Sequence, residues 1–254
     1  GWESFVEDVI PQTRGTAPPS AIAVCACAAN IGPGPSCALC SLRTLPVAIP
    51  PNSAGVTEQV DLGEWSPYNT GIHMLLHTKD AEFGTQAPLF ALPDLEGETI
   101  TLHDALGSKG LVVAFICNHC PYVKAMVSEL VSDANTLSAI GVNVVGIMSN
   151  DYRTYPADAP SKMVEFATQH AMSFPYLLDD SQEVAKAYGA VCTPDFFGYD
   201  GEGLLRYRGR LDNGGVQRPS RRVPELLNAM KLVTETGEGP AEQNPSIGCS
   251  IKWR

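Results

Sequence analysis

Apolar residues along the chain fall into patterns that predict alternating strands and helices. Residues 110–117 (GLVVAFIC) and 142–149 (VNVVGIMS) are continuous apolar runs with many β-branched side chains. Such runs are typical of strands that a sheet buries on both faces. Between them, apolar residues recur at helical spacing at Val123, Met126, Val127, Leu130 and Val131. We therefore expect a strand–helix–strand unit in this part of the chain.

Shorter patterns on both sides extend this unit. Residues 87–106 form two extended segments around the turn residues 94–97, and residues 195–200 and 204–209 flank two glycines. Both arrangements predict hairpins. We predict helices over 162–170, over 180–188 after a capping box of Asp180 and Glu183, and from Pro224 through Val233. This order indicates an α/β sandwich with a mixed sheet, opened by a short hairpin.

The N-terminal part has a different composition. Nine of the chain's twenty prolines lie in the first 73 residues, and no lysine precedes Lys79. Because proline and glycine interrupt periodic patterns, we predict a mostly irregular extension over 1–78, a folded domain over 79–236 and a C-terminal tail over 237–254. The run that begins at Met74 resembles a natural protein start. The residues before it are then either an extension without a fold of its own or translated upstream sequence.

Charge and composition exclude several classes of partner. The formal net charge of −11 over 254 residues argues against nucleic acid, because phosphate binding needs a basic face. No apolar run reaches the roughly 18 residues of a membrane span. The start of the chain lacks a basic segment followed by an apolar one, so we expect a cytoplasmic protein. Eight cysteines are too few for a disulfide scaffold of this length.

Two cysteines stand where a predicted strand passes into a predicted helix. Cys117 closes the apolar run, and Cys120 begins the helical pattern. The N–H groups at a helix N-terminus stabilise a thiolate, and a protonated His119 would add a positive charge beside it. A second thiol three residues away can then close a ring and release a product. This C-x-x-C pair therefore indicates redox chemistry.

Two other readings of the pair remain. A zinc site needs four ligands, and the remaining candidates in this part of the chain are scattered singly, at His103, His170, Cys192 and Cys249. We therefore expect no metal and no cofactor. Two inert buried thiols are the other possibility, which the polar residues Asn118 and His119 and the following Pro121 disfavour.

A second stretch, VCTPDFF (191–197), places a Thr-Pro pair directly before a predicted strand, where a cis-proline could occur. Together with APLFALPDLEGETITL, FICNHCPYVKA, GAVCTPDFFGYD, YRGRLDN and the terminal GCSIKW, it makes residues 82–235 resemble the thioredoxin superfamily. The nearest resemblance is to the redoxin group of alkyl hydroperoxide reductase and thiol-specific antioxidant proteins, in its peroxiredoxin-like branch. This resemblance implies a thioredoxin-like three-layer sandwich with a central mixed sheet.

The resemblance also implies roles for single residues. Cys117 would be the attacking thiol and Cys120 the resolving thiol. Pro194 would be a cis-proline facing the pair, and Thr193 would present backbone groups to a bound substrate disulfide. His119 stands where strongly oxidising relatives also carry histidine.

Two departures from the family pattern matter. A peroxiredoxin loop reads Pro-x-x-x-Thr/Ser-x-x-Cys, but counting back from Cys120 places Cys117 at the threonine position and Val113 at the proline position. Peroxidase activity is therefore in doubt. Thioredoxins also carry a buried acid in the preceding strand, whereas residues 111–116 hold no carboxylate. Asp195, next to Pro194, is our candidate for that role.

The remaining cysteines and histidines leave alternatives open. Cys192 either exchanges disulfides with the pair or is a semi-buried bystander, and Cys249 is either a further resolving thiol or a free terminal cysteine. Four N-terminal cysteines form C-x-C-x9-C-x2-C, which either binds a metal or has no fixed structure. They are Cys25, Cys27, Cys37 and Cys40, and His73 and His77 form a separate i, i+4 pair that we read as exposed.

These observations support one leading function and two alternatives. The leading hypothesis is a thiol–disulfide oxidoreductase in redox homeostasis that acts on protein or small-molecule disulfides and draws on an external thiol reductant. The first alternative is a thiol peroxidase. The second is a redox-sensing or metal-holding module whose cysteines never turn over.

Overall fold

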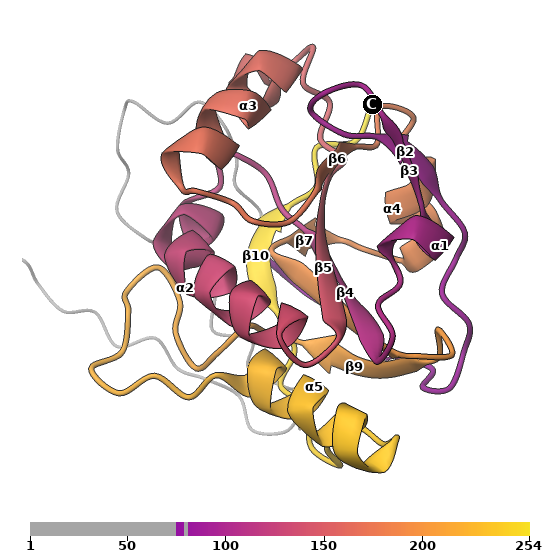
Figure 1. The fold of residues 1–254 in the computed structure, drawn as a ribbon. Helices are drawn as coiled ribbons and strands as arrows, with labels where there is room; N and C mark the ends of the chain where they lie inside the picture. Colours follow the sequence, from indigo (N-terminus) through magenta and orange to yellow (C-terminus); the bar gives the residue numbers. More distant parts are fainter. Residues whose placement is uncertain (1–74, 79–80) are drawn as a thin grey trace, which may run out of the picture. The chain divides into compact units, whose positions relative to one another are not determined.

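The centre of the fold is a five-stranded mixed sheet with the order β6-β5-β4-β8-β9 (Figure 1). The computed structural model describes residues 75–78 and 81–254. β4 pairs parallel to β5 and antiparallel to β8, and this change of direction makes the sheet mixed. The strands are β4 (Gly110–Phe115), β5 (Val142–Met148), β6 (Tyr176–Leu178), β8 (Asp195–Asp200) and β9 (Leu205–Gly209).

Alternation along β4 divides the core into two layers. Val112, Ala114 and Ile116 pack into one apolar cluster, and Leu111, Val113 and Phe115 pack into the other. The first cluster includes side chains of α2 (Pro121–Ser138), α3 (Pro160–Gln169) and α5 (Glu225–Thr236). The second includes side chains of α1 (Leu102–Ala105) and α4 (Glu183–Tyr188), which Figure 1 shows on the opposite side of the sheet. The described residues therefore form the predicted thioredoxin-like sandwich.

The N-terminal hairpin is also present. β2 (Ala91–Pro93) pairs antiparallel with β3 (Thr99–Thr101). The connecting turn is held by Asp94, whose Oδ1 accepts from the backbone N–H groups of Glu96 and Glu98, each at 2.9 Å. Thr101 then caps α1 by accepting from the N–H of Asp104. The predicted turn residues 94–97 thus lie where the sequence indicated.

A second, three-stranded sheet joins distant parts of the chain in the order β1-β10-β7. Its strands are β1 (Leu75–His77), β10 (Ile247–Ser250) and β7 (Cys192–Thr193), all antiparallel. β1 lies in the segment that we assigned to the extension, and β10 lies in the predicted tail. The boundaries predicted at 78 and 236 therefore do not coincide with the limits of strand pairing.

Other differences concern short elements. β6 was not predicted, and the 3-10 helix η1 (Pro156–Asp158) lies in a stretch with no helical pattern. The capping box predicted for α4 is wrong. Gln182 is the N-cap, at a φ of 64°, and the Asp179 carboxylate accepts from the N–H of Ala185 at 2.9 Å. Pro224 is the N-cap of α5 rather than its first helical residue.

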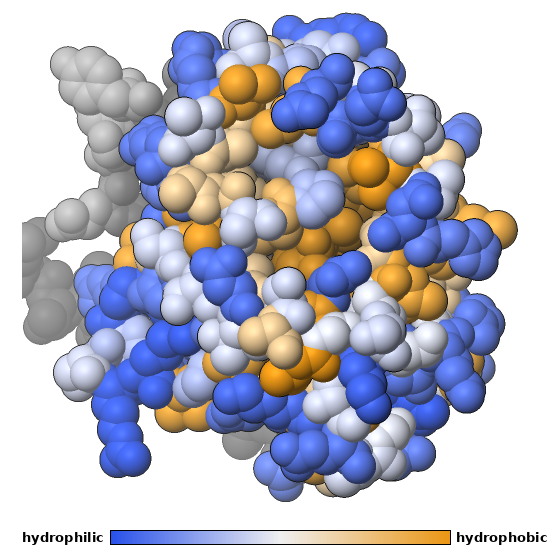
Figure 2. All heavy atoms as spheres, viewed as in Figure 1, coloured by the Kyte–Doolittle hydropathy of each residue, from blue (hydrophilic) through white to orange (hydrophobic). Residues whose placement is uncertain are grey.

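The surface in the view of Figure 2 is mostly hydrophilic, with apolar residues gathered near the middle of this face. Among the described residues, no helix is both long and apolar enough to cross a membrane. The four N-terminal cysteines and His73 lie outside the residues that the structure describes, so the predictions for them stay predictions. His77 is exposed, in β1.

Candidate active site

The two cysteines of the C-x-x-C pair lie between β4 and α2. β4 ends at Phe115, and Cys120 is the N-cap of α2, with Pro121 as the first helical residue. Proline suits that position because its fixed φ fits the helix and its missing N–H would have no helical partner. Both sulfurs are buried: Cys117 is 1% exposed and Cys120 is 0% exposed.

The Thr193–Pro194 loop faces this pair. The peptide bond between these residues is cis, as predicted. The Sγ of Cys117 lies 3.3 Å from Oγ1 of Thr193, and the Sγ of Cys120 donates to the Thr193 carbonyl at 3.1 Å. The fold thus brings Thr193 into contact with Cys117, 76 positions earlier in the chain, and with Cys120, 73 positions earlier.

A buried acid that was not predicted holds the segment between the cysteines. Oδ1 of Asp158 accepts from the backbone N–H groups of Asn118 at 2.9 Å and His119 at 3.2 Å. Its Oδ2 accepts from the side-chain amide of Asn150 at 2.8 Å and lies 2.6 Å from Nδ1 of His119. Asp158 is in η1, far from the pair in sequence, and no local pattern marks it. It positions His119, whose Nδ1 lies 3.9 Å from the Sγ of Cys117.

Among the described residues, Cys117, His119 and Asp158 could supply metal ligands, since their donor atoms lie within 4.8 Å of one another. A cysteine, a histidine and a carboxylate are suitable ligands for zinc. However, each oxygen of Asp158 already has two hydrogen-bonding neighbours within the protein. This arrangement accounts for the burial of the carboxylate without an ion.

The two thiols of the pair have opposite electrostatic environments. Burial, a hydrogen bond with Cys120 and the charge of Asp158 raise the pKa of Cys117 well above its usual value. Hydrogen bonds from the thiols of Cys117 and Cys249 lower the pKa of Cys120, with help from the backbone at Val123 and Cys249. A single negative charge on the pair is therefore favoured on Cys120, whose hydrogen bond to the Thr193 carbonyl exists only in the protonated form. The role of Cys117 as the attacking thiol stays a prediction.

The two further candidate thiols lie on opposite faces of the pair formed by β7 and β10. Cys249 is opposite Thr193, and Ser250 is opposite Cys192. Residues directly opposite in a sheet share a face, and neighbours along a strand alternate. Cys249 therefore shares the face on which Thr193 meets the pair, whereas Cys192 is turned away and donates to the Pro194 carbonyl at 3.5 Å. Both are buried, and burial raises the pKa of Cys192.

Asp195, the proposed proton-transfer group, is the first residue of β8. It is completely buried, and its Oδ2 lies 3.3 Å from Nη2 of Arg208. Burial raises the pKa of Asp195 to about 7, although the charge of Arg208 acts in the opposite direction. The guanidinium of Arg208 in turn lies 4.5 Å from the centre of the Phe197 ring. A carboxyl with this pKa can hold or release a proton at neutral pH.

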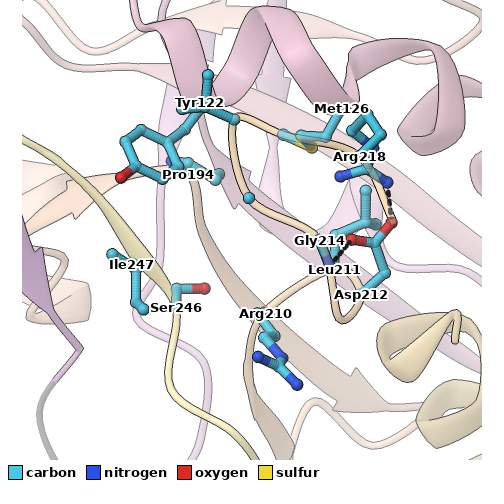
Figure 3. A pocket seen from close by; sticks show the side chains of 12 residues that line it. Tyr122, Met126, Pro194, Arg210, Leu211, Asp212, Gly214, Arg218, Ser246 and Ile247 are labelled. Atoms are coloured by element: carbon cyan, nitrogen blue, oxygen red, sulfur yellow. Dashed lines mark hydrogen bonds and ion pairs between the residues drawn. The ribbon is translucent and has the colours of Figure 1, made fainter. Parts of the chain in front are cut away.

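A pocket of about 230 Å³ opens beside Pro194 (Figure 3). Its walls come from α2, from the loop after β9 and from the segment that leads into β10. Figure 3 shows Tyr122 next to Pro194, and Arg218 paired with Asp212 at the opposite wall. Burial and the charges on Cys249 and Cys120 raise the pKa of Tyr122. The pocket therefore lies beside the start of α2 and the cis-proline loop.

Comparisons with known proteins agree with this arrangement. Residues 83–208 match the AhpC/TSA family. Peroxiredoxin Bcp of Escherichia coli strain K12 is 29% identical over 132 residues, which are 52% of this chain and 80% of that protein.

Two solved structures are similar over most of their own length. An uncharacterized conserved protein from Geobacillus kaustophilus is 42% identical with a TM-score of 0.66, covering 71% of this chain and 97% of that chain. A hypothetical protein from Sinorhizobium meliloti 1021 is 38% identical with a TM-score of 0.68, covering 70% and 98%. The match of residues 83–208 to the AhpC/TSA family, together with the mixed sheet and the cis-proline beside the cysteine pair, shows that the chain belongs to this family, in the peroxiredoxin-like part of the thioredoxin superfamily.

Proposed function

We propose that this protein is a thiol–disulfide oxidoreductase that uses Cys117 and Cys120. Membership of the family supports a general role in thiol redox chemistry. The observation that carries the finer assignment is the contact of both sulfurs with a single residue, Thr193, at 3.3 Å and 3.1 Å. Two thiols held together at one point can pass from dithiol to disulfide with little movement.

The reaction follows from these contacts. A proton passes from Cys117 to the Cys120 thiolate, against the direction of their two pKa shifts, and leaves a Cys117 thiolate. This thiolate attacks one sulfur of a substrate disulfide, whose bond breaks, and the departing thiolate takes a proton from Cys120. The Cys120 thiolate then attacks the Cys117 sulfur, forms the Cys117–Cys120 disulfide and releases the second substrate thiol. An external dithiol returns the pair to its reduced form by the same exchange.

A thiol peroxidase is the second candidate. The family match and the lowered pKa of Cys120 favour it, because Cys120 occupies the cysteine position of the peroxiredoxin loop. Against it, Val113 lies inside β4 with a fully buried side chain, and Cys117 replaces the hydroxyl residue of that loop. Consumption of hydrogen peroxide with a dithiol reductant decides the matter. A rate no higher than that of a free thiol would remove this candidate.

The test of the leading proposal is the reduction of insulin with a dithiol as the electron source. Cys117→Ser and Cys120→Ser should each reduce turnover to the background rate. Cys192→Ser makes the same change at a buried sulfur that is turned away from the pair, so it should retain turnover. Undiminished activity of Cys117→Ser would refute the assignment.

The direction of electron flow needs a separate measurement. The reduction potential of the Cys117–Cys120 couple, measured against glutathione, distinguishes the two cases. A value near about −270 mV would indicate a reductase, and a value near about −120 mV would indicate an oxidant.

A further inference from the structure

β10 lies against the loop that faces the cysteine pair. Its residue Cys249 is opposite Thr193 in the antiparallel register with β7. The approach is close at Gly248, where a Cβ would stand 2.1 Å from the Thr193 carbonyl oxygen and 3.0 Å from the nitrogen of Pro194. A side chain could not fit there, so this glycine allows the strand to reach the loop. The same carbonyl oxygen accepts from the Cys120 thiol.

Contacts on both sides of Cys249 hold this strand in place. Before it, the Ser246 hydroxyl donates to the Gly209 carbonyl at 2.7 Å. After it, the N–H of Ile251 donates to Val191 at 3.0 Å, and the N–H of Lys252 donates to Oδ1 of Asn150 at 2.9 Å. These hydrogen bonds before and after Cys249 therefore fix the position of this residue in β10.

Cys120 stands between two thiols. The thiols of Cys117 and Cys249 both act on the Cys120 sulfur and lower the pKa of Cys120. The three residues share one apolar cluster, and each is at most 1% exposed. A sulfur with two thiol neighbours can form a disulfide with either of them. The Lys252 ammonium adds a favourable charge near Cys249, because it lowers the pKa of that thiol against the larger opposing effects of Cys120 and burial.

We propose that Cys249 is a third redox-active thiol, which replaces Cys117 as the disulfide partner of Cys120 after each oxidation. This inference rests on the proposed function. The Cys249 thiol attacks the Cys120 sulfur of the Cys117–Cys120 disulfide and gives up its proton as the new bond forms. The Cys120–Cys249 bond forms, the Cys117–Cys120 bond breaks, and Cys117 leaves as a thiolate that takes up the proton of Cys249. No electrons are gained or lost. The exchange regenerates the free Cys117 thiol while the oxidation is stored on Cys120 and Cys249.

Trypsin provides a direct test in the full-length protein, because it separates the partners. Cleavage after Lys109, Lys124, Lys231 and Lys252 places Cys117 and Cys120 in one peptide (110–124) and Cys249 in another (232–252). The protein is oxidised with a limiting amount of diamide, quenched with acid, alkylated and digested without reductant. We expect a disulfide-linked pair of these two peptides by mass spectrometry.

Single variants assign the bond. Cys117→Ser should keep the linked pair, whereas Cys120→Ser and Cys249→Ser should lose it. Cys192→Ser is the matched control for removal of a buried sulfur and should keep it. Gly248→Ala retains every cysteine but forces β10 away from Thr193, so it should also lose the pair. Loss of the linked pair in Cys117→Ser, or its absence from the wild-type protein, would overturn the proposal.

The outcomes for the two proposals differ. If wild-type protein turns over insulin, Cys249→Ser matches it and no linked pair forms, Cys249 takes no part and the oxidoreductase assignment stands. If the linked pair forms but insulin is not reduced, the Cys120–Cys249 exchange stands and the oxidoreductase assignment fails. Circular dichroism of each variant checks that it is folded.

Discussion

Cys192 and Cys249 are two buried thiols on paired strands, and they differ in the face of the sheet that they occupy. Cys249 is opposite Thr193, in the same apolar cluster as Cys117 and Cys120. Cys192 is opposite Ser250, and the charges that act on it are those of Asp195, Cys120 and Arg208. A register shift of one residue in β10 would move Cys249 to the face that Cys192 occupies, because side chains alternate between faces. The pairing of β10 with β7 therefore decides whether Cys249 can react with the pair.

The largest effect that we predict concerns Asp195, the buried carboxyl whose charge acts on Cys192. Its pKa of about 7 in the folded protein lies above the ordinary value of 3.8. The contribution of this proton to stability is therefore complete below about pH 4 and is lost as the pH rises towards 7. About three pKa units correspond to at most roughly 4 kcal/mol. Asp195→Asn should remove this part of the pH dependence, measured as the free energy of unfolding in urea between pH 4.5 and 8.

The quantity to compare in that experiment is the slope of the unfolding free energy against pH. Asparagine resembles the uncharged carboxyl of Asp195 at every pH, so the difference between these two neutral side chains shifts the whole curve by a constant amount. Glu165→Gln, at an exposed ion pair with Lys162, should leave the slope as in the wild type. Parallel curves for Asp195→Asn and the wild-type protein would show that Asp195 does not titrate in this range.

The second prediction concerns the contact between the strands. In Gly248→Ala the added methyl group meets the Thr193 carbonyl at 2.1 Å, so backbone has to move. We expect a loss of about 1–3 kcal/mol in unfolding free energy, the usual cost of overpacking. Gly215→Ala is the control, because the nearest atom to its added Cβ is 4.0 Å away. Equal stabilities of the two variants would mean that β10 is not seated against β7 in solution.

The smallest effect that we predict concerns Thr193, whose hydroxyl contacts the Cys117 sulfur. Thr193→Val keeps the shape of the side chain but removes the oxygen 3.3 Å from the Cys117 sulfur. A hydrogen bond of this kind contributes about 1 kcal/mol, so we expect a change of roughly five- to tenfold in the rate of Cys117 alkylation by iodoacetamide at neutral pH. The pH profile of that rate, followed by mass spectrometry on the tryptic peptide 110–124 in a Cys120→Ser background, isolates Cys117. Thr193→Ser, which keeps the hydroxyl, should react as the wild-type protein does.

The sequence predicted the elements that have a strong internal period. The apolar run at 110–117 became β4, and the helical spacing after Cys120 became α2. The Thr-Pro pair indicated the cis bond, and the change from the apolar run to the helical spacing placed the cysteines at a strand-to-helix junction. These features depend on residues that are near one another in the chain, so a local pattern is sufficient to find them.

The remaining parts depend on distant contacts. β7 has two residues and β10 has four, which is too short for an alternating pattern to stand out. The partner of Cys249 is 56 positions away, at Thr193, and only the folded register shows it. Asp158 lies in a segment that resembles any polar loop, yet its carboxylate holds the backbone of Asn118 and His119. Burial, rather than residue type, gives Asp195 its altered pKa.

The pairing of β10 with β7 also has a consequence for affinity. The edge of β7 carries backbone donors and acceptors that any extended chain could use, and β10 already occupies them. A polypeptide disulfide that bound along the same edge would compete with a segment of the protein itself. Its measured affinity would then be its intrinsic affinity multiplied by the fraction of molecules in which β10 has left. A small disulfide does not need this edge, so the same competition would not lower its affinity.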